Sequence, residues 1–61
     1  MKTLSINFLN ENNFDKAVEI LTPKNFDSFL LNITIQVPEH SINTILFELE
    51  LNNINFNTNI Y

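Results

Sequence analysis

The chain contains no cysteine and no glycine. Without cysteine it can form neither a disulfide nor a thiolate metal site. Without glycine it lacks the Gly-rich loops that hold phosphate groups. It also lacks the Asp-rich loop from which six or more oxygen ligands reach a hard cation. We therefore expect no cofactor and no metal.

Arginine is absent too, and three lysines stand against seven carboxylates, which gives a net charge of −4. Nucleic-acid binding depends on clustered cations that displace counterions from phosphates, so we expect no direct contact with nucleic acid. No apolar run approaches the ~20 residues of a membrane span, and no signal-peptide pattern opens the chain. The expected location is therefore cytoplasmic, without membrane contact. An acidic protein of this kind suits a partner with a basic surface.

With 61 residues, the sequence predicts a single small domain over 1–61. A chain this short buries only about 60% of its extended surface, so its stability is marginal without help. Hydrophobic residues make up 44% of the sequence, which is an ordinary share for a folded protein. Because no disulfide or metal can stabilise it, we expect a homo-oligomer.

Apolar and polar residues alternate over residues 28–37, with Leu30 as the one exception. Alternation of this length is typical of a half-buried strand, and Pro38 ends it because proline cannot donate to a strand ladder. The same alternation predicts strands over residues 2–9 and 54–60. The side chains expected to face the core are Leu4, Ile6, Phe8, Phe29, Leu31, Ile33, Ile35, Val37, Ile54, Phe56, Thr58 and Ile60.

The opposite positions of these strands carry no charge and no aromatic ring. They are Thr3, Ser5, Asn7, Asn32, Thr34, Gln36, Asn55, Asn57 and Asn59. A face this polar is left to solvent, which places both helices on the other face and favours an antiparallel sheet. It also lacks the aromatic rings and basic groove of a single-stranded nucleic-acid platform.

An apolar stripe at i, i+3, i+4 and i+7 runs from Phe14 to Leu21 and predicts a helix over Glu11 to Leu21. The asparagines at its start suit a helix cap, and Pro23 ends it because the residue before proline leaves helical geometry. The connector over residues 23–27 is long enough to carry the chain back. We therefore expect the second strand to oppose the first.

Residues 39–52 have two interpretations. Apolar residues at 42, 45, 46 and 49 make one helical stripe, and Asn52–Asn53 suits a helix end because asparagine tolerates the left-handed conformation. Alternatively, alternation over 45–51 makes a strand, and Asn52–Asn53 is the two-residue turn of a C-terminal hairpin. The Pro-Glu start and the leucines and glutamates of the segment favour the helix.

The fold class that follows is α+β. We expect a small βαβαβ sandwich, with two helices on one face of a three-stranded, mostly antiparallel sheet. The alternative is βαβββ, with the C-terminal hairpin turning at Asn52–Asn53. The first order resembles a reduced ferredoxin-like sandwich in its architecture alone; no family motif accompanies it, and fold alone does not give function.

Two groups of residues are candidate partner-binding sites. Glu11, Asp15 and Glu19 are spaced four apart and form an acidic ridge on the first helix, suited to a basic partner such as a nuclease. The alternative is a solvated face, since like charges at this spacing mildly destabilise a helix. Phe47 and Leu51 lie off the apolar stripe of the second helix, as exposed interface pairs do. Their alternative is burial on a second side of that helix.

His40 is the only histidine of the chain, and no nucleophile or carboxylate is placed to face it for acid–base chemistry, so we expect no enzyme. The leading function is a small acidic protein–protein interaction module that self-associates. Its concrete form is an inhibitor or antitoxin-like protein of a phage or mobile element, which small size, acidity and an AT-rich coding bias suggest. The alternative is a regulatory domain that binds a small molecule at a dimer interface.

Overall fold

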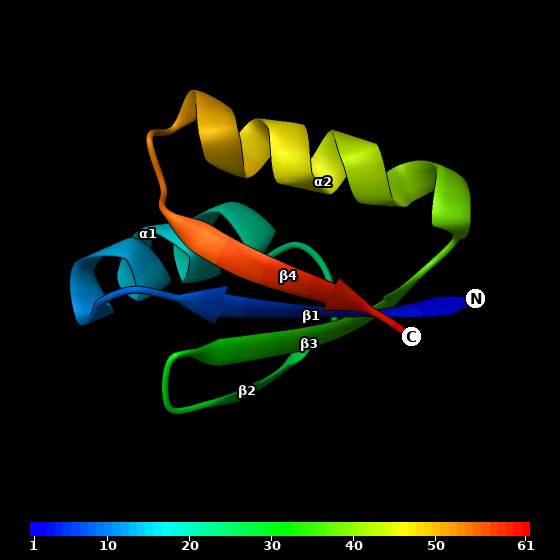
Figure 1. Cartoon of the computed structure of the whole chain (residues 1–61), viewed down its shortest axis with the longest axis horizontal. Helices are drawn as coiled ribbons and strands as arrows, with labels where there is room; N and C mark the ends of the chain where they lie inside the picture. The colour runs from blue at the N-terminus through cyan, green and yellow to red at the C-terminus, as the bar shows by residue number, and fades with distance from the viewer.

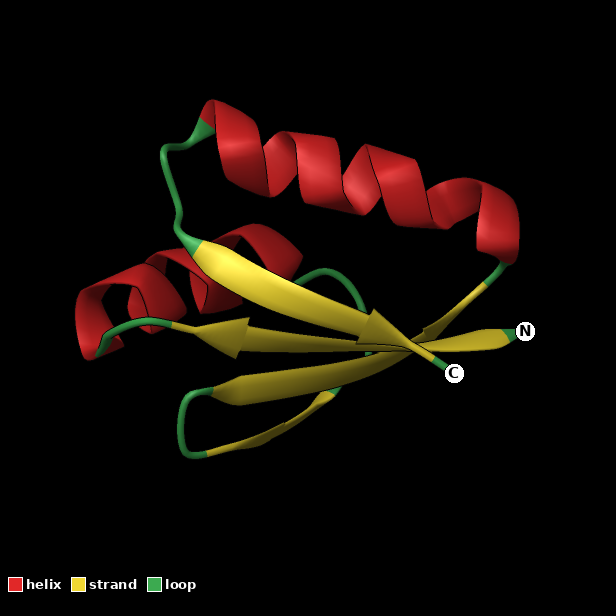
Figure 2. Ribbon diagram, in the orientation of Figure 1, coloured by secondary structure: helices red, strands yellow, loops and turns green.

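A computed structural model describes all residues, 1–61. Two helices cover one side of a four-stranded sheet in which every neighbouring pair of strands is antiparallel (Figures 1 and 2). The elements follow in the order β1 (Lys2–Phe8), α1 (Glu11–Leu21), β2 (Asp27–Phe29), β3 (Asn32–Val37), α2 (Glu39–Leu51) and β4 (Phe56–Ile60). The strand order across the sheet is β2-β3-β1-β4. This βαββαβ arrangement is that of the ferredoxin-like motif. In it the two strands of a βαβ unit are not adjacent: here β3 lies between β1 and β2, and β1 lies between β3 and β4.

The core lies between the sheet and the two helices, and twelve buried apolar side chains form it as one cluster. The central strands β1 and β3 contribute alternate residues, because successive side chains of a strand point to opposite faces. In the register of this pair, Leu4 lies opposite Ile35 and Ile6 opposite Ile33. The helical residues of the cluster are Ala17 and Leu21 from α1 and Ile42, Ile45 and Leu49 from α2.

The helix α1 begins and ends at the residues that the apolar stripe predicted. Asn10 is its cap: the side-chain Oδ1 of Asn10 accepts a hydrogen bond from the backbone N–H of Asn13 at 2.9 Å. This bond satisfies one of the free donors of the first turn. At the other end, the Thr22 hydroxyl donates to the Val18 carbonyl oxygen at 2.6 Å.

The segment with two interpretations is the helix α2, so the C-terminal hairpin is wrong. Beyond its end, Asn53 has a left-handed φ of 58°. The Asn53 N–H donates to the Glu50 carbonyl oxygen and the Ile54 N–H to that of Leu49, the two bonds of a Schellman motif. Leu49 and Ile54 are both buried, as the apolar contact of that motif requires. This cap ends α2 and turns the chain toward the sheet, where β4 begins.

The predicted strand over residues 28–37 is wrong as a single element. It is a hairpin of β2 and β3, joined by a two-residue turn at Leu30 and Leu31. The φ of Leu30 is 56°, and a positive φ at the first central position alone is the pattern of a type II′ turn. The β2–β3 hairpin, and not the connector over residues 23–27, is therefore what makes β3 antiparallel to β1. The sheet gains a fourth strand, and β3 still opposes β1 as expected.

Phe29 was expected in the core and lies on the other side of the sheet. In an unbroken strand it would share a face with Ile33, four residues on. The two-residue turn instead pairs Phe29 with Asn32, which moves its ring to the polar face, where it is 75% exposed. Leu31 keeps its expected role and packs partly buried against the core.

The last strand confirms its expected face but not its expected burial. Ile60 lies opposite the buried Leu4 and so points to the core side, yet it is 52% exposed. Phe56 and Thr58, on the same side, are half-buried. The strand is at the edge of the sheet, where the helices leave its core-facing side partly uncovered.

The outer face is polar at its centre and is internally hydrogen-bonded. The Asn32 side-chain amide donates to Ser5 Oγ at 2.9 Å and to Asn7 Oδ1 at 2.8 Å. The Thr34 hydroxyl donates to Asn32 Oδ1 at 3.1 Å. We call these four side chains the amide network.

The expectation of an outer face free of charge and aromatic rings is wrong at its margins. Asp27 lies opposite Thr34, and Phe29 lies on the same strand. At the other edge, Tyr61 exchanges both backbone hydrogen bonds with Thr3. Asp27 and Phe29 lie on the outer face because of the β2–β3 hairpin, and Tyr61 because the pairing with β1 continues to the end of the chain. Alternation within a single strand predicts neither.

Candidate functional site

The acidic ridge of α1 is exposed along its whole length. Glu11, Asp15 and Glu19 all face solvent, and none of the side-chain hydrogen bonds of the protein involves them. The structure separates them into two environments. Glu11 and Asp15 line a hollow of about 460 Å³, whereas Glu19 lies beyond it, one turn further along the helix.

The turn between β2 and β3 forms the other wall of that hollow. Its lining is completed by Phe14 of α1 and by Leu30 and Leu31 of the turn. We call this surface the tip site, and its residues are Glu11, Phe14, Asp15, Leu30 and Leu31. It combines three apolar side chains with two carboxylates at the rim. The combination suits an apolar group that carries a positive charge beside it.

One backbone hydrogen bond holds the turn against the rest of the sheet. The Phe8 N–H donates to the Leu31 carbonyl oxygen at 2.9 Å, at the end of β1 where the chain turns into α1. The ring of Phe8 in turn meets Phe14 edge-on, with centroids 5.9 Å apart. Of the residues of the tip site, Phe14 is therefore held by packing and Leu31 by a backbone hydrogen bond. Leu9, which follows Phe8, is exposed beside it.

Leu30 is held in an unfavourable conformation without being buried. Its φ of 56° places a residue with a Cβ in the left-handed region, which costs roughly 1–2 kcal/mol. Its side chain is 78% exposed, so little packing offsets that cost. Residues with strained backbone cluster at active sites, ligand clamps and switch regions, so Leu30 is a candidate functional residue.

The second predicted pair, Phe47 and Leu51, is exposed on α2, at 60% and 65%. Their burial on a second side of the helix is therefore wrong. Phe47 lines a hollow of about 550 Å³ together with Asn43, Thr44, Leu46 and Glu50. Leu51 is outside it. The structure does not bring this pair into the tip site.

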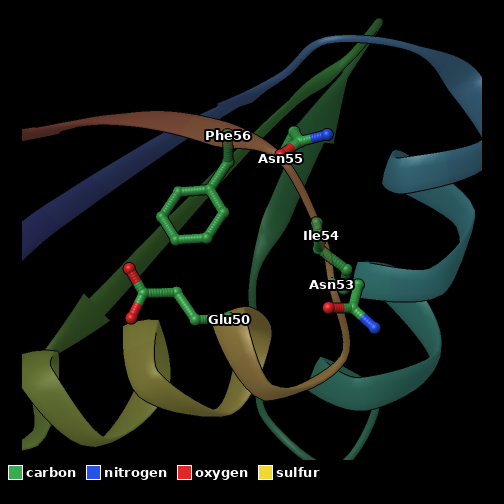
Figure 3. A pocket seen from close by; sticks show the side chains of 5 residues that line it. All are labelled: Glu50, Asn53, Ile54, Asn55 and Phe56. Carbon is green, nitrogen blue, oxygen red and sulfur yellow. The ribbon is translucent and has the colours of Figure 1, made fainter.

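A third hollow, of about 480 Å³, opens where α2 approaches the start of β4. Figure 3 shows the Glu50 side chain on the helix and the Phe56 ring on the strand, both directed into the space between the two elements. Asn53, Ile54 and Asn55 of the connecting segment complete the lining. Glu50 thus lies between this hollow and that of Phe47.

No three His, Cys, Asp or Glu side chains come together in a way that could hold a metal ion. His40 is exposed in the first turn of α2. Neither helix has both the length and the apolar character needed to cross a membrane.

Comparison with protein-family models, curated proteins and solved structures found no match. The candidate site therefore depends on the geometry described above.

Sequence reasoning missed the apolar residues that the structure exposes at the ends of strands. Leu30 and Phe29 were assigned to one strand, and Ile60 was assigned to the core. One signal for the first pair was present: Leu30 broke the alternation, and two successive leucines cannot both face the core of a strand. Nothing in the sequence signalled that β4 would be left partly uncovered.

Proposed function

We propose that this protein is a small acidic interaction module that acts by binding another protein at the tip site. The observation that carries the proposal is Leu30, an exposed apolar side chain on a strained backbone, beside the carboxylates of Glu11 and Asp15. A module whose turn served folding alone would gain stability from asparagine or glycine at this position. A leucine there has a use if its side chain enters a pocket of a partner.

The charge of the molecule defines the class of partner. Two carboxylates at the rim and a net charge of −4 favour approach to a basic surface, because opposite potentials steer association and raise its rate. The partner segment that fits best has an apolar side chain or pocket flanked by lysine or arginine. Glu19, on the same helix face, can extend the charged contact.

In its concrete form, the module is an inhibitor that covers a basic surface of an enzyme, such as the nucleic-acid channel of a nuclease. Small size and acidity support this form, which antitoxin-like proteins of phages and mobile elements would share.

Affinity capture from an extract of the source cells, at low salt, tests the proposal. The bait is the wild-type protein, compared with Leu30→Asn, with Glu11→Gln/Asp15→Asn and with the exposed control Leu51→Asn. A single protein retained by wild type and by the control should be lost at least about tenfold with Leu30→Asn, as at a binding hot spot. The double variant should weaken capture and reduce its dependence on salt. Equal capture by all four baits, or capture of nothing, contradicts the proposal.

The alternative, a domain that binds a small molecule near a dimer interface, draws some support from the hollow at Glu50. Its volume of about 480 Å³ is within the range of ligand pockets, and its lining includes the amides of Asn53 and Asn55. A panel of metabolites should then raise the melting temperature of wild type but not of Asn55→Ala. No shift with any compound argues against this function.

A further inference from the structure

The two edges of the sheet differ in how well they are protected. The strand β2 has three residues, all exposed, and includes the charged Asp27. The strand β4 has five residues, FNTNI, with no charge and no proline. Short edge strands and edge charges prevent pairing with other chains, and an uncharged five-residue edge does not. The molecule therefore presents one open edge, at β4.

The backbone groups that β4 presents outward can be assigned from its pairing with β1. Thr3 and Tyr61 exchange both backbone hydrogen bonds, at 3.1 and 2.9 Å. Bonded and non-bonded pairs alternate in an antiparallel ladder, so Asn57 and Asn59 also bond to β1. The N–H and C=O groups of the intervening residues point away from the sheet. These residues are Phe56, Thr58 and Ile60.

The side chains of those three residues lie on the core side, where the cover by α2 is incomplete. Phe56 is half-buried and Ile60 is about half exposed, although its neighbour Leu4 is fully buried. On α2, Glu50 faces Phe56 across the hollow of Figure 3, and Phe47 lines the next hollow along that flank. The apolar layer of the molecule is thus open along this edge.

We propose that a second copy of this chain pairs antiparallel along β4, across a two-fold axis at Thr58. In this register Phe56 lies opposite the partner's Ile60, and Thr58 lies opposite the partner's Thr58. Outward backbone groups then meet outward groups at every position, since all three residues present theirs to the same edge. The two sheets become one continuous sheet, and the two α2 helices run antiparallel beside each other.

The edge is self-complementary, which favours a second copy over an unrelated strand. Each Phe56 ring gains a cross-strand contact with an aliphatic side chain, and the aliphatic Ile60 loses its exposure to water. On the outer face Asn57 lies opposite the partner's Asn59, so no like charges meet on the strand. A two-fold interface uses the same patch on both subunits, as this register does.

The expected dimer is weak and depends on concentration. A stable interface takes about 800 Å² from each partner, which is about a fifth of the 4184 Å² surface of this protein. An interface formed by one edge strand and one helix flank is at or below that size. We therefore expect a dissociation constant on the order of micromolar.

The mass in solution, measured by light scattering from low micromolar to near-millimolar concentration, tests the dimer with a matched pair of edge prolines. Thr58→Pro removes an outward N–H of β4, and Ser28→Pro removes one of β2, so neither breaks a bond within the sheet. Wild type and Ser28→Pro should become dimers with rising concentration, while Thr58→Pro should stay a monomer with an unchanged circular dichroism spectrum. A wild type that stays a monomer, or a Thr58→Pro variant that still dimerises, overturns the proposal. If the proline unfolds the chain, Ile60→Asp serves as the second variant, since it adds like charge to the interface and leaves the backbone intact.

The register is tested by a single introduced thiol, because the chain has no cysteine of its own. Directly opposite residues of a bonded pair have Cα atoms about 5.5 Å apart, which is within the range of a disulfide. Thr58→Cys should therefore form linked dimers under mild oxidation, and Asn57→Cys should not, because its own copy is two positions away. Equal cross-linking of both variants contradicts this register.

This inference does not rest on the proposed partner at the tip site. Leu30→Asn should leave the mass in solution unchanged, and Thr58→Pro should leave capture by the tip site measurable. The failure of one proposal is thus distinguishable from that of the other.

Discussion

Leu30 has a left-handed backbone in a two-residue turn, and its exposed side chain lines the same hollow as two carboxylates. The sequence offers no glycine anywhere, so any left-handed position must be taken by a residue with a Cβ. At Asn53, the other such position, the chain uses asparagine, which tolerates the conformation. Leucine tolerates this conformation less well than asparagine, and this difference is the reason why the proposed function is placed at the Leu30 turn.

Replacing Leu30 by asparagine should make the fold more stable. Leu30→Asn relieves the left-handed strain and should raise the free energy of unfolding by about 1 kcal/mol. For a chain of this size, that corresponds to a rise in melting temperature of about 4–8 °C. Thermal unfolding followed by circular dichroism gives the value.

The control for this variant is Leu51→Asn, which changes another exposed leucine, the last residue of α2. It should lower the stability by a few tenths of a kcal/mol, since asparagine is a poorer helix former than leucine. A loss of stability in Leu30→Asn as large as that of the control would show that the leucine turn is not strained.

At the scale of elements, the helices were predictable and the hairpin was not. The helix α1 has a cap residue, an apolar stripe and a proline beyond its end, and all three agree with its observed bounds. The turn at Leu30–Leu31 has none of the glycine, proline or asparagine residues by which hairpins are recognised. The break in alternation at Leu30 was the one local signal, and it does not specify a turn. The turn is held by tertiary contacts such as the hydrogen bond from the Phe8 N–H to the Leu31 carbonyl oxygen.

The same limit applies to the candidate site. The spacing of Glu11 and Asp15 placed both on one helix face, and the structure confirms this. Their meeting with Leu30 depends on the missed turn, so the apolar half of the tip site could not be predicted. Phe47 and Leu51 were predictable as exposed residues because the stripe at positions 42, 45 and 49 left them out.

Two leucines of α2 provide a test of how that helix is oriented. Leu49 is fully buried and Leu51 is largely exposed, two positions further on. Leu49→Ala should cost about 2–5 kcal/mol, which leaves a small domain largely unfolded. Leu51→Ala should change stability by no more than about 0.5 kcal/mol. Urea denaturation of both variants measures the difference, and similar losses in the two would contradict the described face of α2.

At the scale of the whole molecule, stability and self-association should be linked. Thirteen residues of 61 are buried, which is a small number for a chain that has no cysteine and so no disulfide. If the folded chain pairs along β4, dimer formation stabilises the folded state by mass action. Dimer formation would then both raise the free energy of unfolding and pair the open edge of the sheet.

The melting temperature of the wild type should therefore rise with protein concentration. Each tenfold increase, in the range where dimers form, should add up to about 1.4 kcal/mol to the apparent stability, which is a shift of several degrees. The melting temperature of Thr58→Pro should stay constant over the same range. Scanning calorimetry at several protein concentrations measures this shift. A wild-type melting temperature that does not change with concentration would argue against the dimer.

The amide network has a consequence for how the strands find their correct alignment. If β3 shifted by two residues along β1, its apolar side chains would still face the core. The paired core positions of the two strands carry aliphatic residues of similar size, so the core would tolerate the shift. The polar side of the sheet is where such a slip is penalised: Asn32 would no longer meet both Ser5 and Asn7 with its two amide hydrogens. Hydrogen bonds on the polar face therefore help to specify the register of β3 against β1, which apolar packing in the core does not specify alone.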